Sequence, residues 1–206
     1  MTRARVSVVK VGGSLLDSPE LPRRLRAWLA AETAAQHDTH VVLIAGGGKW
    51  VDAIRHLDAH TPLGDERAHW ICIALMDVTA GLIGAMLPEL CTTSSLAEVE
   101  SRLLVPGVTL LRPGEFVREC EPTLAGTRLP ANWSVSSDSI AGRLAIVLGA
   151  DEVVLLKSAP PPTTPNGHDW LAGLAAARYV DAFLPTLRDE LPGQRFETLP
   201  PQQPMS

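Results

Sequence analysis

Runs of consecutive apolar residues alternate along this chain with stretches in which apolar residues recur every three or four positions. A continuous apolar run predicts a strand buried on both faces, whereas the three-to-four spacing predicts an amphipathic helix. The predicted strands are 6–11, 40–45, 105–111, 153–157 and 195–199, and the predicted helices are 21–36, one that opens at 50–57, 66–87 and 136–148. Because strands and helices alternate, the pattern predicts an α/β fold with a parallel sheet covered by helices on both sides.

The composition supports a folded chain and argues against two kinds of nucleic-acid binding. Of 206 residues, 46% are hydrophobic and 20% are charged, which suffices for a sizeable core. The net charge of -5 argues against a protein that binds nucleic acid by neutralising many phosphates. Aromatic residues make up only 4% of the chain, too few for a platform that stacks single-stranded bases.

The cysteines and the longest apolar stretch predict a reduced, cytoplasmic protein that does not enter a membrane. Cys72, Cys91 and Cys120 are odd in number and lack CxxC spacing, so neither a disulfide framework nor a zinc site is expected. The N-terminus lacks the apolar segment of a signal peptide. The stretch 70–87 contains Asp77, so it is expected to be a buried helix. It is also richer in apolar surface than one small sheet needs, which predicts a homo-oligomer interface.

Three polar stretches follow predicted strands or begin a predicted helix. They are 10–14 (Lys-Val-Gly-Gly-Ser), 46–49 (Gly-Gly-Gly-Lys) and 136–139 (Ser-Ser-Asp-Ser), and a fourth strand ends on Lys157. Ligands of parallel α/β sheets bind at the carboxyl ends of the strands. Glycine turns there can present backbone amides to an anion, and a lysine can add a point charge. The pattern therefore predicts a phosphate-binding site at this edge.

Each stretch taken alone also has a purely structural explanation. A glycine pair after a strand can be only a tight turn, an Asp at a helix start only a cap, and a strand-end lysine a surface residue. The lysine distribution favours a site, because the only lysines, Lys10, Lys49 and Lys157, all stand at strand ends or glycine turns. Neither a Walker A loop nor a GxGxxG dinucleotide motif fits the spacing around Gly48.

Four segments in this order resemble the amino acid kinase family, over about three quarters of the chain. They are Val9-Lys-Val-Gly-Gly-Ser14, Ala45-Gly-Gly-Gly48, Ser137-Asp-Ser-Ile-Ala141 and Asp151-Glu-Val-Val-Leu-Leu156. The resemblance implies a three-layer αβα sandwich around a mainly parallel sheet. It also implies transfer of the ATP γ-phosphoryl group to a carboxylate, carbamate or phosphate oxygen. It further implies a single domain over 1–206, in which 1–150 binds the acceptor and 151–206 forms a shortened nucleotide-binding part.

The resemblance also implies a role for each site residue. Phosphoryl transfer requires mainly positioning and charge neutralisation from the protein. Lys10 would neutralise the transferred phosphoryl group, Lys157 would act on the nucleotide side, and Asp138 would orient both lysines and could hold an acceptor amine. Phosphate or nucleotide binding is expected from Gly12, Gly13, Ser14 and Ser158, and acceptor binding from Gly46, Gly47, Gly48, Asp52 and Ser137. Mg²⁺ would arrive with ATP rather than at a metal site of the protein.

A narrower resemblance is to small family members of methanofuran and tetrahydromethanopterin one-carbon metabolism, which phosphorylate an aminomethylfuran-methanol phosphate. It rests on short length, on 68–71 running into 75–77, and on 133–138 and 155–158. The sequence departs from the family where a Val-Asp-Gly turn usually follows the last motif, because Ala159-Pro-Pro-Pro162 stands there and opens a proline-rich loop to Gly167. Two alternatives therefore stay open: a non-catalytic anion-binding paralogue that has lost ATP, and a kinase for another acceptor, such as a nucleoside or isoprenoid phosphate or an amino acid carboxylate.

Overall fold

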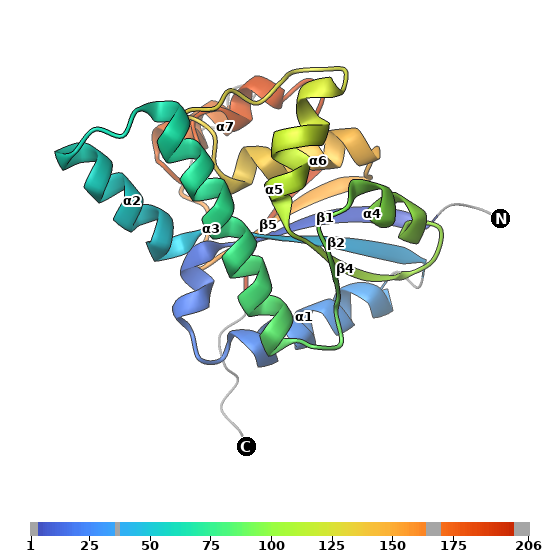
Figure 1. The fold of residues 1–206 in the computed structure, drawn as a ribbon. Helices are drawn as coiled ribbons and strands as arrows, with labels where there is room; N and C mark the ends of the chain where they lie inside the picture. The colour runs from blue at the N-terminus through green and yellow to red at the C-terminus, as the bar shows by residue number, and fades with distance from the viewer. Residues whose placement is uncertain (1–3, 36–37, 164–169, 200–206) are drawn as a thin grey trace.

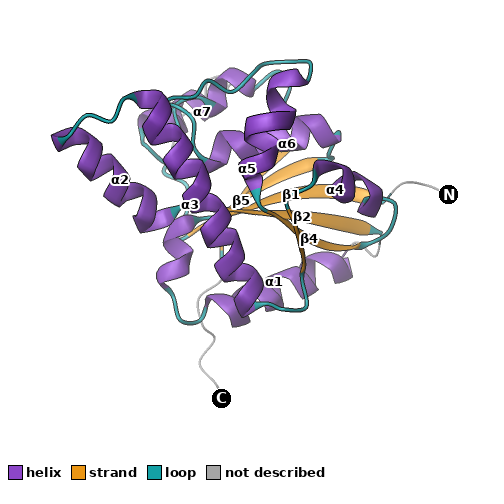
Figure 2. Ribbon diagram, in the orientation of Figure 1, coloured by secondary structure: helices purple, strands orange, loops and turns teal. Residues whose placement is uncertain are grey.

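Six parallel strands form one sheet at the centre of the computed structural model, which describes residues 4–35, 38–163 and 170–199. The strands are β1 (Arg5–Val11), β2 (Thr39–Ala45), β3 (Cys91–Thr93), β4 (Gly107–Leu111), β5 (Glu152–Lys157) and β6 (Gly193–Thr198). Their order across the sheet is β3-β4-β2-β1-β5-β6, and each pairing is parallel. Figure 2 shows the neighbouring strands β4, β2, β1 and β5. Every residue of β2 is buried, as its unbroken apolar run predicts.

Helices cover both faces of this sheet. They are α1 (Leu21–Ala35), α2 (Gly48–His60), α3 (Asp65–Met86), α4 (Leu96–Arg102), α5 (Pro113–Glu115), α6 (Ser137–Leu148) and α7 (Trp170–Ala176). In Figure 1, α1 lies below the sheet, whereas α4, α6 and α7 lie above it. Alternate side chains of β1 point to opposite faces of the sheet. Val6 and Val8 pack in the core with α6 on one face. Val9 and Val11 pack in the core with α1 on the other face. The predicted three-layer αβα sandwich is thus confirmed.

Helix α3 crosses from one layer to the other. Ile73 and Met76 belong to the core on the α6 side, whereas Ile83 and Leu87 belong to the core on the α1 side. Eight of its 22 residues are buried, so the helix is less enclosed than the sequence predicts. By length and composition alone α3 could cross a membrane, but its buried side chains pack against the sheet as a core helix does. Its outer face leaves apolar side chains exposed.

The predicted elements agree with the structure apart from their ends, but α7 and part of the region between β2 and α6 were not predicted. Strand β4 begins at Gly107 rather than at Val105, which lies 57% exposed in the preceding turn. The region 88–123 contains elements that the sequence pattern did not predict: β3, α4, α5 and the turns η2 (Phe116–Cys120) and η3 (Glu121–Thr123). Each is seven residues or shorter, too short to show a clear period. Of the proline-rich loop, residues 164–167 lie outside the described residues.

Candidate functional site

Two glycine turns touch each other at the carboxyl edge of the sheet. The first leads from β1 into the 3₁₀ turn η1 (Gly13–Asp17), and the second leads from β2 into α2. A Cβ atom on Gly13 would lie 2.0 Å from the Gly48 amide nitrogen. Gly48 has a φ of +56°, and a Cβ atom there would lie 2.6 Å from the Gly13 carbonyl oxygen. Glycine is therefore required at both positions by close backbone approach, and at Gly48 also by conformation.

Hydrogen bonding narrows the set of amides that can bind an anion. The Gly12 amide donates to the Leu156 carbonyl at 2.8 Å, and the Gly46 amide donates to the Val11 carbonyl at 2.9 Å. These two amides extend the sheet, which corrects the predicted role of Gly12 as an N–H donor to phosphate. The amides of Gly13, Gly47 and Gly48 stand where η1 and α2 begin, and a helix start leaves such amides without a partner in its own helix.

A buried carboxylate links two of the three lysines at the same edge. Asp138, in the first turn of α6, places one oxygen 2.9 Å from the Lys10 ammonium and the other 2.7 Å from the Lys157 ammonium. The side chains of Lys10, Asp138 and Lys157 are 6%, 5% and 13% exposed. We call these three residues the ion centre. It brings together the three residues predicted to be catalytic, from β1, α6 and β5.

Charge and burial act against each other in the ion centre. Burial alone would raise the pKa of the Asp138 carboxyl, but the positive charges of Lys10 and Lys157 outweigh burial and hold that pKa below its ordinary value. Burial and the nearby charge of Lys10 lower the pKa of Lys157 to about 8, although Asp138 opposes this shift. The Lys157 ammonium also donates to the Tyr179 carbonyl at 2.7 Å. Asp138 is therefore ionised at neutral pH and has a cation on each side.

A second carboxylate, the half-buried Asp181, holds the start of α6 in place. It accepts hydrogen bonds from the backbone amides of Ser136 and Ser139, both at 2.9 Å, and from both serine hydroxyls. Burial and the neighbouring charge of Asp138 raise the pKa of Asp181. Ser136 thus stands at the cap position but does not itself cap α6. Asp181 was not predicted from the sequence, because it lies 42 residues from its amide partner Ser139 and in no recognisable motif.

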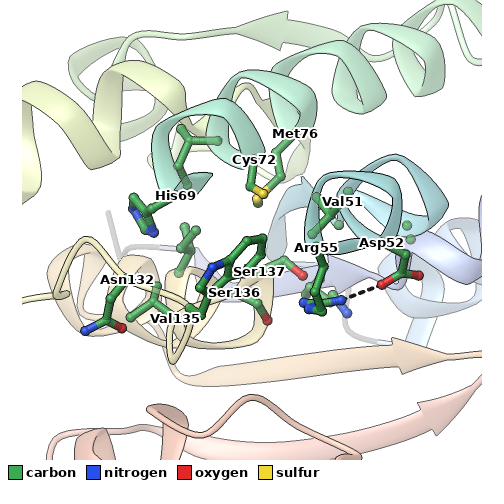
Figure 3. Close-up of a pocket in the computed structure, with 18 residues that line it drawn as sticks. Val51, Asp52, Arg55, His69, Cys72, Met76, Asn132, Val135, Ser136 and Ser137 are labelled. Atoms are coloured by element: carbon green, nitrogen blue, oxygen red, sulfur yellow. Dashed lines mark hydrogen bonds and ion pairs between the residues drawn. The ribbon is translucent and has the colours of Figure 1, made fainter. Parts of the chain in front are cut away.

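A cavity of about 180 Å³, which we call the glycine cavity, lies between the second glycine turn and α3. Its polar wall comes from the glycine turns, Lys10, Arg55, Ser136 and Ser137. Figure 3 shows His69, Cys72 and Met76 of α3 facing Asn132, Val135, Ser136 and Ser137 across this cavity. Its apolar wall comes from Val51, Cys72, Ile73, Met76, Val135 and Ile140. Such a site combines a polar end, with backbone amides and a lysine, with a surface that suits a small apolar group.

A second cavity of about 660 Å³, which we call the α7 cavity, adjoins the first. Asp138 and Lys157 line it together with the segment from Ala175 to Ala182, and Arg55, Trp133 and Ser136 line both cavities. Lys10 therefore faces the glycine cavity and Lys157 faces the α7 cavity, with Asp138 bonded to both. This arrangement places one cation of the ion centre on each side of the junction between the two cavities.

The remaining predicted residues lie around these cavities. Asp52 lines the glycine cavity at its exposed side and pairs with Arg55 at 2.5 Å, as the dashed line in Figure 3 shows. The Ser14 and Ser158 hydroxyls are 2.9 Å apart, so the structure joins the first glycine turn to the end of β5. Lys49 instead pairs with Asp17 at the surface, at 2.7 Å.

Some residues that line the glycine cavity went unassigned in the sequence analysis. Trp133 donates to the Asp58 carboxylate at 2.8 Å, and Arg55 lies over the Trp133 ring at 5.2 Å. Burial lowers the pKa of His69, which also lines the cavity. The one sequence signal for His69 was its place in the segment 68–71, which carried part of the narrower resemblance. Among residues 4–35, 38–163 and 170–199, no group of three His, Cys, Asp or Glu could hold a metal ion.

Comparison with known proteins agrees with these features. The model of the amino acid kinase family matches residues 5–161. A curated relative, the [5-(aminomethyl)furan-3-yl]methyl phosphate kinase of Methanocaldococcus jannaschii, is 23% identical over 149 residues, which is 72% of this chain and 63% of the relative. The chain thus spans less than two thirds of that relative's length.

Solved structures of uridylate kinases share the fold. The enzyme from Archaeoglobus fulgidus aligns with a TM-score of 0.59 at 18% identity, covering 89% of this chain and 86% of its own. The UMP kinase of Bacillus anthracis aligns with a TM-score of 0.64 at 11% identity, covering 96% and 88%. Fold and site together define an α/β protein with paired glycine turns at the carboxyl edge of a parallel sheet. The family match is more specific: this chain belongs to the amino acid kinase family.

Proposed function

We propose that the protein is an ATP-dependent kinase that transfers the γ-phosphoryl group to the phosphate of a small acceptor. The observation that carries this proposal is the ion centre, in which one buried carboxylate holds two lysines that face two adjoining cavities. Acceptor and donor phosphates are both anionic, and a lysine on each side of their meeting point offsets their repulsion. The family match and the kinase name of the curated relative support a phosphotransferase and do not favour a non-catalytic paralogue.

In this proposal each part of the site positions one phosphate. The amides of Gly47 and Gly48 bind the acceptor phosphate, while the Gly13 amide and Lys10 bind the transferred group. A phosphorus–oxygen bond forms to the acceptor phosphate oxygen as the bond to the ADP oxygen breaks. The protein donates no electrons, so its contribution is position and charge, and a preorganised donor of this kind contributes about 3–4 kcal/mol to lowering the barrier.

The α7 cavity is the proposed nucleotide side. Lys157 and Ser158 belong to the part from 151 onward, which supports the predicted division into an acceptor part and a shortened nucleotide part. Where the family pattern expects Val-Asp-Gly, the Tyr179 hydroxyl donates to the Ala159 carbonyl at 3.0 Å, so Tyr179 contacts this departure from the pattern. Mg²⁺ would be carried by the nucleotide and would neutralise charge on its phosphates.

The glycine cavity and the curated relative support one class of acceptor. About 180 Å³ is small beside the roughly 300–1,000 Å³ of pockets for drug-sized ligands. A small ring bearing a methyl phosphate fits a cavity with one anion-binding end and one apolar wall. The curated relative is named for such an acceptor, an aminomethylfuran methyl phosphate. We therefore propose that class as acceptor, in one-carbon cofactor biosynthesis, ahead of nucleoside or isoprenoid phosphates and amino acid carboxylates.

A second copy of the chain is the proposed partner for the outer face of α3. Ile71, Val78 and Leu82 are 40%, 56% and 41% exposed, and they lie seven and four positions apart on one side of the helix. Trp50 of α2 lines the same surface hollow as Leu82 and is 46% exposed. An uncharged helical ridge of this spacing pairs well with a copy of itself. Light scattering tests this proposal: the Val78→Glu substitution should convert a dimer into a monomer.

A cytoplasmic location also stays a prediction.

Acceptor profiling tests the proposed reaction. ADP release from Mg-ATP should depend on an added acceptor, and the aminomethylfuran methyl phosphate should give the highest kcat/KM among the four acceptor classes. A preference for UMP or an isoprenoid phosphate would reassign the acceptor but retain the kinase. Absence of both Mg-ATP binding by calorimetry and ADP release with every acceptor would favour the non-catalytic paralogue.

A further inference from the structure

Arg178 has a backbone conformation that its residue type does not explain. Among the described residues it is the one non-glycine residue with a positive φ, at 56°. It follows the end of α7, where its amide donates to the Ala175 carbonyl and the Tyr179 amide donates to the Leu174 carbonyl, each at 2.9 Å. A helix end closed in this way usually has glycine at the left-handed position, because a side chain is disfavoured there. Non-glycine residues in this conformation cluster at functional sites.

Contacts with the ion centre fix the backbone around Arg178. The carbonyl of Tyr179 accepts from the Lys157 ammonium at 2.7 Å, and the Tyr179 ring lies 5.2 Å from the same ammonium. Two residues further on, Asp181 is hydrogen-bonded to the start of α6. The chain on one side of Arg178 is thus tied to the residues that surround Asp138. This places Arg178 in the wall of the α7 cavity.

Within the part of the chain that the structure describes, the N–H donors of the Arg178 guanidinium have no partner. Three cationic side chains line the α7 cavity, and two of them already have anionic partners: Lys157 pairs with Asp138, and Arg55 pairs with Asp52. Arg178 is exposed, and within the described residues its guanidinium forms no hydrogen bond or ion pair. A guanidinium can bind phosphate through two parallel N–H donors. Arg178 therefore offers a forked phosphate ligand on the same cavity wall as the lysine of the ion centre.

We propose that Arg178 binds the polyphosphate of the nucleoside triphosphate in the α7 cavity, and that its left-handed backbone is retained for this purpose. The inference rests on the proposed function and adds to it a nucleotide-binding residue. The competing explanation is that Arg178 only closes α7, where a positive charge near the helix end is mildly favourable. The two explanations predict different Mg-ATP affinities for a variant with glycine at this position.

Arg178→Gly separates the two explanations, because glycine relieves the backbone and removes the charge together. We expect its Tm to rise by about 2–4 °C, as the left-handed position no longer carries a side chain. We expect the KM for Mg-ATP to rise at least about tenfold, because hydrogen bonds to a charged group are lost, while the KM for the acceptor stays within about twofold. Arg178→Lys should recover part of the ATP affinity, and Arg178→Asn, which is neutral and tolerates this backbone, should not.

Calorimetry with Mg-ATP in the absence of acceptor keeps this test independent of turnover. A tenfold loss of Mg-ATP affinity in Arg178→Gly supports the inference even if the acceptor has been wrongly assigned and wild type releases no ADP. An unchanged Mg-ATP affinity in a more stable Arg178→Gly protein would overturn it, and so would a change confined to the acceptor KM. If wild type binds no Mg-ATP, both this inference and the proposed function fail.

Discussion

The ion centre and the surface pair of Lys49 with Asp17 have the same contact distance in different surroundings. Lys157 and Lys49 each lie 2.7 Å from a carboxylate oxygen. The side chains of Lys157 and Asp138 are 13% and 5% exposed, whereas those of Lys49 and Asp17 are 64% and 51% exposed. Water and salt screen the exposed pair, but the buried pair interacts in a medium of low polarity. The two ion pairs therefore have the same contact distance but are expected to differ in strength, because only the pair of Lys157 with Asp138 is buried.

The same comparison explains what lysine scarcity does and does not indicate. All three lysines stand at strand ends or glycine turns, as the sequence shows. Two of them converge on Asp138, because β1 and β5 are neighbours in the sheet. Lys49 lies in the first turn of α2, is exposed, and pairs with Asp17 instead. The three lysines thus share the same kind of sequence context, but the fold brings only two of them together at Asp138.

The largest effect is expected from Asp138→Asn, which removes the anion between two buried lysines. Losing one partner of a buried ion pair costs about 3–5 kcal/mol, because the remaining charge stays desolvated. We expect a loss of unfolding free energy of that order and a fall in kcat of at least about a hundredfold. Urea unfolding and ADP release measure the two effects. If this variant were as stable as wild type, the ion centre would be solvated. The buried pair would then not differ in strength from the surface pair of Lys49 with Asp17.

The pH dependence of Lys157 sharpens the comparison further. Its pKa of about 8 means that the free enzyme loses this cation as the pH rises through that value. We expect kcat/KM, which reports groups of the free enzyme, to fall about tenfold per pH unit above pH 8. Lys157→Arg should lower activity but move this alkaline limb upward, because a guanidinium stays protonated. An identical limb in Lys157→Arg would assign it to another group.

The contact between the two glycine turns can be tested with a matched pair of glycines. Gly48 and Gly64 have φ values of +56° and +86°, but a Cβ atom on Gly48 would meet Gly13 backbone, whereas one on Gly64 would meet nothing within 4 Å. The left-handed conformation costs each alanine variant about 1–2 kcal/mol of unfolding free energy, and Gly48→Ala must in addition push the two glycine turns apart. We expect Gly48→Ala to lose more stability and most of its activity, and Gly64→Ala to retain kcat. Equal kinetics in the two variants would mean that the turns can separate freely.

The smallest effect is expected from Lys49→Ala. An exposed ion pair contributes about 0–1 kcal/mol, and salt reduces this further. We expect a change in unfolding free energy of no more than about 0.5 kcal/mol and a kcat within about twofold of wild type. A large loss of activity would place Lys49 in the site, against the structure.

The sequence predicted those parts of the site that depend on local pattern. The β-branched runs located the strands, and the order of motifs predicted that Lys10, Asp138 and Lys157 act together. Asp181 and Arg178 could not be predicted in this way. Asp181 acts on backbone amides of α6 more than 40 residues away, and the conformation of Arg178 depends on how α7 ends. Neither leaves a period or a motif in the sequence.

The exposed face of α3 and the different roles of two adjacent glycines could not be predicted from the sequence for a similar reason. The period of α3 predicts an apolar helix, but it cannot show which apolar face lacks a neighbour, because that depends on the layers around it. Gly12 and Gly13 look equivalent in sequence. Only the sheet register distinguishes them, because it commits the Gly12 amide to Leu156.

The most direct test of the account is acceptor-dependent ADP release by wild type, Lys10→Ala and Lys49→Ala under the same conditions, with circular dichroism to confirm folding. The account predicts that Lys10→Ala loses about a hundredfold or more in kcat while Lys49→Ala turns over like wild type. Undiminished turnover by a folded Lys10→Ala protein would contradict the claim that the ion centre stabilises the transferred phosphoryl group.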